Sequence, residues 1–368
     1  MYDFSIKRRV VGFLGVALAL SLICSGCASL SDAARVSGPD YGWKIKESSV
    51  EFLTSEFLSP TLGYAIASRE SGVALFRTSD GGDSWQPVST LSGIRVIDLD
   101  FFNPNVGLMV VETYVPDRKQ RILRSTDQGR SWLPVFESAS TQINELALSK
   151  ANGVDAIAVG STIDESRPPY LSSQSSPVLL LTSNQGTEWR DESGSISATI
   201  GEKEIFAAAM MSVQYGCLVL TSNGRLLSRS SGSDKWSTLL SPKSRTLTFY
   251  PLGAFNDGDP WIIGGTGAIE GVESSLGVFD GSWSFREMED WYITDAISIG
   301  EEGIMVSGRI GTGGNLTRAG IYFSSDRGRK WSVVHEVEDS SVTFAPLVRV
   351  SKDRVLTGNG LIIYRKPE

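Results

Sequence analysis

Short runs of apolar residues, many alternating with polar ones, recur along the chain and are separated by residues that favour turns. Runs at residues 74–77, 122–124, 179–181 and 321–323 each end at such a turn, and further runs at 86–88, 133–136 and 332–334 follow three of them. This spacing predicts β-strands joined in hairpins. No long segment beyond the N-terminus has the apolar period of a helix, so the pattern indicates an all-β protein.

The four turns share one pattern, Ser/Thr-x-Asp/Asn-x-Gly-x-x-Trp, at residues 78–85, 125–132, 182–189 and 324–331. We call them the box turns. The acidic or amide side chain can accept hydrogen bonds from nearby backbone amides, glycine supplies a positive φ, and tryptophan covers the base of the hairpin. Each part has a folding role, so we assign structural rather than catalytic roles to Thr78, Asp80, Gly82, Trp85, Asp127, Gly129, Trp132, Asn184, Gly186, Trp189, Asp326, Gly328 and Trp331.

On these four motifs the chain resembles the Asp-box, or BNR, repeat family of β-propellers. Sialidases, sortilin-type receptors and propellers similar to photosystem II assembly factors carry the same box. The resemblance is nearest to the last group, whose propellers have seven blades. It implies a propeller of four-stranded antiparallel blades, and it is specific for the repeat unit rather than for a function.

The spacing of the repeats indicates the number of blades. Consecutive boxes lie 47 residues apart (Asp80 to Asp127) and then 57 apart (Asp127 to Asn184), and degenerate copies at 230–236 and 279–283 fill the next gap. Residues 41–368 number 328, which is seven units of about 47 residues. A six-bladed ring is the alternative, with one terminal segment left as a tail.

The two ends of the chain supply the seventh unit together. Three apolar runs lie between residues 342 and 364, one strand short of a blade, while residues 41–46 resemble the end of a box with Trp43. We expect the segment around Trp43 to pair with the segment around Ile362 and close the ring, which removes exposed sheet edges.

The first 40 residues have a different composition. Residues 7–9 are basic, residues 10–23 carry no charge, and Cys24-Ser25-Gly26-Cys27 follows, which resembles a bacterial lipobox with Cys24 in place of a leucine-like residue. We expect residues 1–26 to be a lipoprotein signal peptide, Cys27 to be acylated, residues 27–40 to be a flexible tether and residues 41–368 to be the propeller. Ala28 favours the outer membrane, facing the periplasm, in a Gram-negative cell. A plain secretion signal is the alternative.

The net charge limits the classes of molecule that the chain is expected to bind, and the cysteine content limits its possible disulfides. The net charge is −8, and without residues 1–26 it becomes 31 − 41 = −10. An acidic chain does not favour nucleic acid or anionic lipid as a partner. If Cys27 is acylated, Cys217 lacks a disulfide partner, and we interpret it as a buried free thiol.

The sequence contains little that indicates catalysis. His335 is the only histidine, no cluster has the spacing of metal ligands, and no glycine-rich phosphate loop is present. The chain lacks the Arg-Ile-Pro motif that accompanies the boxes in sialidases. Asp98, Asp100, Asp295 and Glu204 lie near or within expected strands, where solvated or turn-capping roles are commoner than the paired-carboxylate role of a glycosidase. We predict no enzyme activity, no metal and no cofactor, with a sialidase-like glycan-binding or glycan-cleaving protein as the alternative.

Four connections are long, at residues 113–120, 161–177, 265–275 and 308–318. All four are expected on the face opposite the boxes, where long loops on a rigid scaffold favour recognition. We therefore predict a non-catalytic, monomeric, lipid-anchored envelope protein, a scaffold or assembly factor, that binds a protein partner on this face. The candidate binding residues are Tyr114, Arg118, Lys119, Arg121, Arg167, Tyr170, Arg309 and Arg318, together with Trp291 and Tyr292 from an expected adjoining loop.

Overall fold

The computed structural model describes most of the chain from Tyr41 to Arg365. The described ranges are 41–70, 72–114, 118–149, 153, 155–162, 176–197, 206–212, 216–221, 225–230, 233, 235–240, 261–264, 273–279, 283–289, 291–300, 303–312 and 315–365. The proposed signal peptide, Cys27 and the tether therefore lie outside the described residues. No helix among the described residues is long and apolar enough to cross a membrane.

The protein is all-β, as the apolar pattern predicts, with one short helix, α1 (Ser193–Ser197). The described strands form six antiparallel sheets of four strands and one of three. The first three sheets are β2 (Thr54–Phe57), β3 (Gly63–Arg69), β4 (Gly72–Thr78) and β5 (Gln86–Leu91); β6 (Ile94–Phe101), β7 (Gly107–Thr113), β8 (Lys119–Ser125) and β9 (Leu133–Ser138); and β10 (Thr141–Leu148), β11 (Ala156–Thr162), β12 (Pro177–Thr182) and β13 (Arg190–Asp191).

The remaining sheets follow in chain order. They are β14 (Phe206–Ser212), β15 (Gly216–Thr221), β16 (Leu226–Arg229) and β17 (Ser237–Leu240); β18 (Trp261–Gly264), β19 (Glu273–Phe279) and β20 (Trp283–Glu289); β21 (Trp291–Ser298), β22 (Ile304–Thr312), β23 (Asn315–Ser324) and β24 (Ser332–Val337); and a terminal sheet of β25 (Leu347–Ser351), β26 (Arg354–Thr357), β27 (Leu361–Tyr364) and β1 (Lys44–Glu47).

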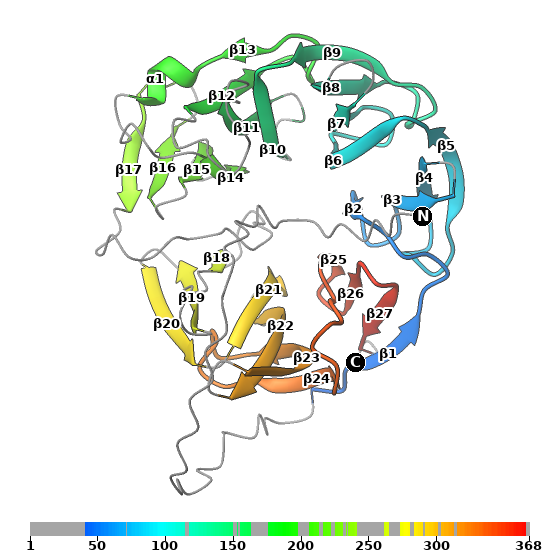
Figure 1. The fold of residues 1–368 in the computed structure, drawn as a ribbon, viewed down its shortest axis with the longest axis vertical. Coiled ribbons are helices and arrows are strands. Elements are labelled where there is room, and N and C mark those ends of the chain that lie inside the picture. Colours follow the sequence, from blue (N-terminus) through cyan, green and yellow to red (C-terminus); the bar gives the residue numbers. More distant parts are fainter. Residues whose placement is uncertain are drawn as a thin grey trace, which may run out of the picture.

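The sheets are arranged about a common centre, with the first strand of each sheet toward it (Figure 1). These inner strands contact one another from β18 through β21, β25, β2, β6 and β10 to β14. The apolar core lies between neighbouring sheets. The rings of Tyr64 and Phe101, from the first and second sheets, stack with centroids 3.9 Å apart, and both side chains are fully buried.

Both ends of the chain contribute to the terminal sheet. β1 pairs with β27 in an antiparallel register in which Ile45 faces Ile363 and Lys46 faces Ile362. The predicted pairing of the terminal segments is therefore present. Asp83, from the first box turn, accepts hydrogen bonds from Lys46 Nζ at 2.5 Å and from the guanidinium of Arg354. The first sheet is thus tied to both a strand from the N-terminal end and a strand from the C-terminal end.

The box turns have the predicted geometry. In the second one, Ser125 Oγ accepts the amide of Gly129 at 2.9 Å, and Asp127 accepts the amide and the hydroxyl of Ser131 at 2.9 and 2.6 Å. Gly129 has a φ of 82°. The backbone of the residue before this glycine is also in the left-handed region. The sequence did not indicate this conformation, because three of the turns have a non-glycine residue at that position: Gln128, Gln185 and Arg327.

The glycines of the box turns also fit the sheets together. A Cβ added to Gly186 would lie 2.5 Å from Leu108 Cδ2, and one on Gly82 would lie 2.7 Å from Leu356 Cδ2. Gly129 has the same relation to Leu75, whose side chain would overlap an added Cβ. In each case the leucine belongs to a neighbouring sheet: Leu108 to the second, Leu75 to the first and Leu356 to the terminal sheet. The missing side chain therefore permits close contact between sheets as well as the turn conformation.

We expect Gly129→Ala to destabilise the protein by about 2–5 kcal/mol. About 1–2 kcal/mol comes from a left-handed conformation with a Cβ, and overpacking against Leu75 adds about 1–3 kcal/mol. Gly93→Ala is the matched control, because Gly93 has a φ of 70° and nothing within 4 Å of an added Cβ. Urea unfolding would measure both variants, and equal losses would contradict a packing role for Gly129.

We expect the stabilising contribution of Asp127 to disappear in acid. Hydrogen bonds from the Ser131 hydroxyl and amide lower the pKa of Asp127 to about 2. Because this pKa lies below the unfolded value of about 3.9, the contribution is complete above pH 4 and is lost as the pH falls toward 2. Asp127→Asn should keep the turn, as Asn184 does in the third box turn.

The measurement is the melting temperature of the wild type and of Asp127→Asn between pH 2 and 7. The wild type should lose its advantage over the variant below pH 4. Asp127→Ala should be destabilised by about 1 kcal/mol at pH 7, as on loss of a helix N-cap. A difference between wild type and Asp127→Asn that is constant with pH would contradict the assignment.

Candidate functional site

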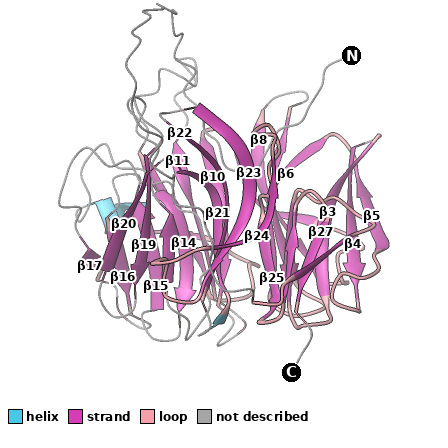
Figure 2. Ribbon diagram, turned by 90° about the horizontal axis from the view of Figure 1, so that it is seen from below, coloured by secondary structure: helices cyan, strands magenta, loops and turns pink. Residues whose placement is uncertain are grey.

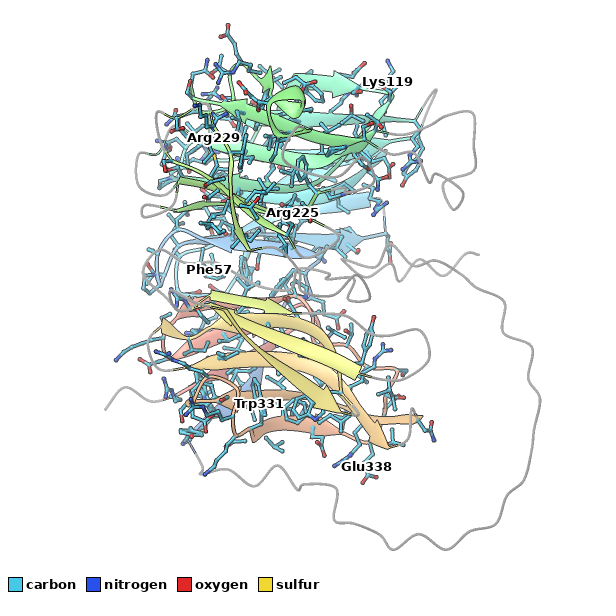
Figure 3. All side chains as sticks on the ribbon, turned by 90° about the vertical axis from the view of Figure 1, so that its left-hand side faces the viewer. Phe57, Lys119, Arg225, Arg229, Trp331 and Glu338 are labelled. Atoms are coloured by element: carbon cyan, nitrogen blue, oxygen red, sulfur yellow. The ribbon has the colours of Figure 1, made fainter. Side chains whose placement is uncertain are left out.

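Strand direction divides the molecule into two faces. β8 ends at Ser125, where the second box turn begins, whereas the β7–β8 connection lies at the other end of the sheet. We call these ends the box face and the far face. Figure 3 shows Lys119 and Glu338 toward one side and Phe57 and Arg229 toward the other, as this division requires. The predicted binding residues that the structure describes belong to the far-face half of their sheets.

The β7–β8 end of the second sheet is built around a buried carboxylate. Glu112, on β7, is only 1% exposed. Its Oε2 accepts hydrogen bonds from the Tyr114 hydroxyl at 2.6 Å and from Arg95 at 3.1 Å, and its Oε1 accepts one from Arg118 Nε. Glu112 therefore holds three side chains from β6 and from the connection in fixed positions.

Opposing effects set the pKa of Glu112. Burial alone would raise it, but the hydrogen bonds from Tyr114 and Arg118 and the charges of Arg118 and Arg95 outweigh burial, so the pKa lies below its usual value. Burial also raises the pKa of Tyr114, and the bond to Glu112 adds to this shift. Glu112 is therefore charged at neutral pH, and the Tyr114 hydroxyl keeps its proton.

A second carboxylate lies on the edge strand of the same sheet. Glu137, on β9, accepts hydrogen bonds from Lys119 Nζ at 2.8 Å and Arg121 Nε at 2.5 Å. The bond from Lys119 contributes most to lowering the pKa of Glu137, followed by the bond from Arg121. Lys119 and Arg121 are two residues apart on β8, so their side chains lie on the same face of the sheet. Both therefore reach the same carboxylate on the neighbouring strand β9.

These residues form a surface that we call the cationic patch: Arg95, Arg118, Lys119 and Arg121, with Tyr114 beside them. The four cations are each between 34% and 48% exposed, and Tyr114 is 52% exposed. Glu112 and Glu137 partly neutralise these cations, so the net charge of the group is 4 − 2 = +2. The structure thus brings together four of the predicted binding residues and adds Arg95, Glu112 and Glu137.

Those three residues were not predicted, because they lie in the strands and not in the connection. Arg95 and Glu112 face each other across β6 and β7, and Glu137 faces Arg121 across β8 and β9. A charged residue inside an otherwise apolar strand, such as Glu112 in a fully buried β7, was the available signal.

In the sixth sheet, the predicted binding residues belong to strands and not to the loops in which they were expected. Trp291 and Tyr292 are not in a loop: they begin β21, and Trp291 is buried against Tyr322 with ring centroids 4.5 Å apart. Residues 308–318 are not an open loop either, because β22 and β23 extend as a paired hairpin as far as Thr312 and Asn315 (Figure 2).

The extended hairpin carries its own carboxylate contacts. Glu336, on β24, accepts hydrogen bonds from Arg318 at 2.7 Å and from the Tyr322 hydroxyl at 2.9 Å. Burial, more than the neighbouring Glu336, raises the pKa of Tyr322. Arg309 lies opposite Tyr292 in the β21–β22 register. Arg167 and Tyr170, the remaining predicted residues, lie outside the described residues.

The described carboxylates that the sequence suggested for a glycosidase accept hydrogen bonds from backbone amides. Asp98 accepts the amides of Leu99 and of Leu146, on the next sheet, each at 2.9 Å. Asp295 does the same with Ala296 and Leu347, each at 2.8 Å. These carboxylates therefore link the inner strands of neighbouring sheets. Asp100 accepts the amide of Phe101, and Glu204 lies outside the described residues.

The remaining reactive side chains are the histidine, the buried cysteine and any groups that could bind a metal ion. His335 is half-buried on β24, where burial lowers its pKa, and its ring packs against Phe344. Cys217 is buried, as predicted, and burial raises the pKa of its thiol to about 11. Among the described residues, no group of three or more His, Cys, Asp or Glu side chains could hold a metal ion.

No protein-family model matches the chain, and no curated protein matches it by sequence. Several solved structures are similar in fold. YCF48 bound to a D1 peptide is 16% identical with a TM-score of 0.58, and the match covers 90% of this chain and 100% of that one. YCF48 from Cyanidioschyzon merolae is 18% identical with a TM-score of 0.56, covering 88% and 99%.

An enzyme shares the same fold at similar distance. The GH74 xyloglucanase from Xanthomonas campestris is 14% identical with a TM-score of 0.53, and the match covers 79% of this chain and 46% of the enzyme. These likenesses show a propeller-like all-β fold, which both peptide-binding and catalytic proteins use.

Proposed function

We propose that this chain is a non-catalytic, lipid-anchored protein of the cell envelope that binds a protein partner through its far face. In this proposal the seven sheets are seven blades of one ring, which the pairing of β1 with β27 closes. Cys27 carries the acyl chains, and in a Gram-negative cell the protein faces the periplasm from the outer membrane. The partner docks on the cationic patch.

The burial of Glu112 is the observation that carries this proposal. Burying a carboxylate is costly unless it is paired and hydrogen-bonded. Here the compensating groups are Arg95, Tyr114 and Arg118, each of which keeps a substantial exposed surface. The arrangement fixes two guanidinium groups and a phenol at the surface before any partner arrives, and such preorganisation lowers the entropy lost on binding.

The chemistry of the patch suggests an acidic partner segment. Arginine and tyrosine are enriched at protein interfaces, and arginine binds carboxylates with two parallel hydrogen bonds. A local charge of +2 on a chain of net charge −8 distinguishes this surface from its surroundings. Electrostatic complementarity of this kind favours partner choice and orientation.

The YCF48 structure with a D1 peptide supports peptide binding as one use of this fold. At 16% identity this likeness concerns the fold, so the proposed partner is specified only by its acidic chemistry. The likeness to a xyloglucanase keeps a glycan-cleaving alternative in view. Against that alternative, Asp98 and Asp295 already accept two backbone amides each.

We expect charge reversal in the patch to abolish partner capture. Arg118→Glu combined with Arg121→Glu should lower the affinity for an acidic partner roughly tenfold or more, because like charges would then meet. Arg130→Glu combined with Arg190→Glu is the matched control, since it makes the same change of charge at exposed residues away from the patch.

The measurement is quantitative co-purification from envelope membranes in which the wild type or a variant is tagged. One or more proteins should be recovered with the wild type and the control and lost with the patch variant. Melting temperatures would verify that all three chains are folded. Equal recovery with both double variants would contradict binding at the patch.

We expect Cys27→Ser to convert the protein from a membrane-bound to a water-soluble form, because several acyl chains are needed for stable anchoring. Detergent-phase partitioning of the expressed protein measures this change. Cys217→Ala is the control, since that thiol is buried in the fourth sheet. A wild type that partitions into the aqueous phase would contradict acylation and favour a plain secretion signal.

A further inference from the structure

The N-terminal end of the described chain lies on the box face. The Tyr41 hydroxyl hydrogen-bonds Ser325 Oγ at 2.6 Å, and its ring packs edge-on against Phe323 at 4.8 Å. Trp43 contacts the same phenylalanine at 5.6 Å, and Arg365 lies over the Trp43 ring at 4.3 Å. Ser325 is the second residue of the fourth box turn, so this turn fixes the position from which residues 1–40 depart.

The fourth box turn differs from the other three in charge. Arg327, Arg329 and Lys330 are exposed on it, and its one acidic residue, Asp326, accepts the amides of Arg329 and Lys330 at 2.9 and 2.8 Å. Its charge is 3 − 1 = +2. By the same count, the turns at 78–85, 125–132 and 182–189 carry −2, 0 and −1.

The chain between Cys27 and Tyr41 is short. Fourteen residue steps span at most about 50 Å when fully extended, and a flexible chain of this length has a root-mean-square span on the order of 20 Å. An anchor at Cys27 would therefore keep the fourth box turn within reach of the bilayer surface. At physiological salt, charges farther than about 8 Å from the surface are largely screened, so the nearest residues dominate over the net acidic charge.

We propose that the box face, led by Arg327, Arg329 and Lys330, lies against an anionic lipid surface. The far face and its cationic patch then point away from the membrane, toward a partner. This inference rests on the lipid anchor of the proposed function and adds the orientation of the anchored protein. Each basic residue next to an anionic bilayer strengthens the interaction roughly fivefold, which is sufficient to orient a protein that its anchor already holds.

The test uses the full acylated protein bound to vesicles of phosphatidylcholine, with or without 30% phosphatidylglycerol. A fluorophore is attached to Ser79→Cys on the box face or to Ser92→Cys on the far face; both serines are exposed, and Cys217 is buried. A quencher carried by the lipid headgroups reports which label lies nearer the membrane. On anionic vesicles we expect the Ser79→Cys label to be quenched at least threefold more than the Ser92→Cys label.

The variant Arg327→Gln/Arg329→Gln/Lys330→Gln should reduce this ratio toward one without changing sedimentation with the vesicles, and so should vesicles of phosphatidylcholine alone. Unchanged melting would verify its fold. Equal or inverted quenching of the two labels on sedimented wild-type protein would overturn the orientation while leaving the anchor and the partner site intact. A wild type that fails to sediment would overturn the anchor and this inference together.

Discussion

The pairing of β1 with β27 brings strands from both ends of the chain into one sheet, and β25 of that sheet contacts β2 of the first sheet. β1 contributes only four residues, which is little for a strand that joins segments more than 300 residues apart in the sequence. Further contacts reinforce it: Asp83 bonds Lys46 and Arg354, and Arg365 covers Trp43. Exposed ion pairs contribute at most about 1 kcal/mol each, so the apolar contacts of Ile45 and Trp43 with the neighbouring core carry more of the stability.

The box turns connect local conformation with packing between sheets. A serine or threonine and an aspartate or asparagine satisfy the amides of the turn, and the glycine that follows leaves space for a leucine of a neighbouring sheet. The same turn therefore closes a hairpin and sets the separation of two sheets. Neither role involves substrate chemistry, so the turns by themselves indicate no particular function.

The sequence was sufficient to predict features that depend on local chemistry or on the repeat. The box turns, the strand before each of them, the strand after three of them and the partnership of the terminal segments follow from residue types and the repeat; β13, after the third box turn, was not predicted. The hairpin of β22 and β23 was not predicted, because glycines at 308, 311, 313 and 314 favour a loop by composition, and only pairing across the sheet decides the outcome.

The candidate site shows the same limit. Arg118, Lys119 and Arg121 were identifiable as basic residues near a connection, but Glu112 gains its role only from burial beside Arg95 and Tyr114. Trp291 was misplaced for a related reason. An aromatic residue before a strand resembles an interface anchor in sequence, whereas its packing against Tyr322 and Trp331 is a property of the folded sheet.

The hydrogen bonding of the box turns has a consequence for how this protein can diverge. Each turn is held by side chains at its first and third positions, whereas its sixth position differs in charge from turn to turn: Asp83, Arg130, Thr187 and Arg329. Arg130 and Arg329 are exposed, so substitutions at these two residues would change the surface charge while leaving the side chains that hold the turn in place. The box face can therefore gain or lose affinities at such exposed residues without a change in the residues that hold its turns.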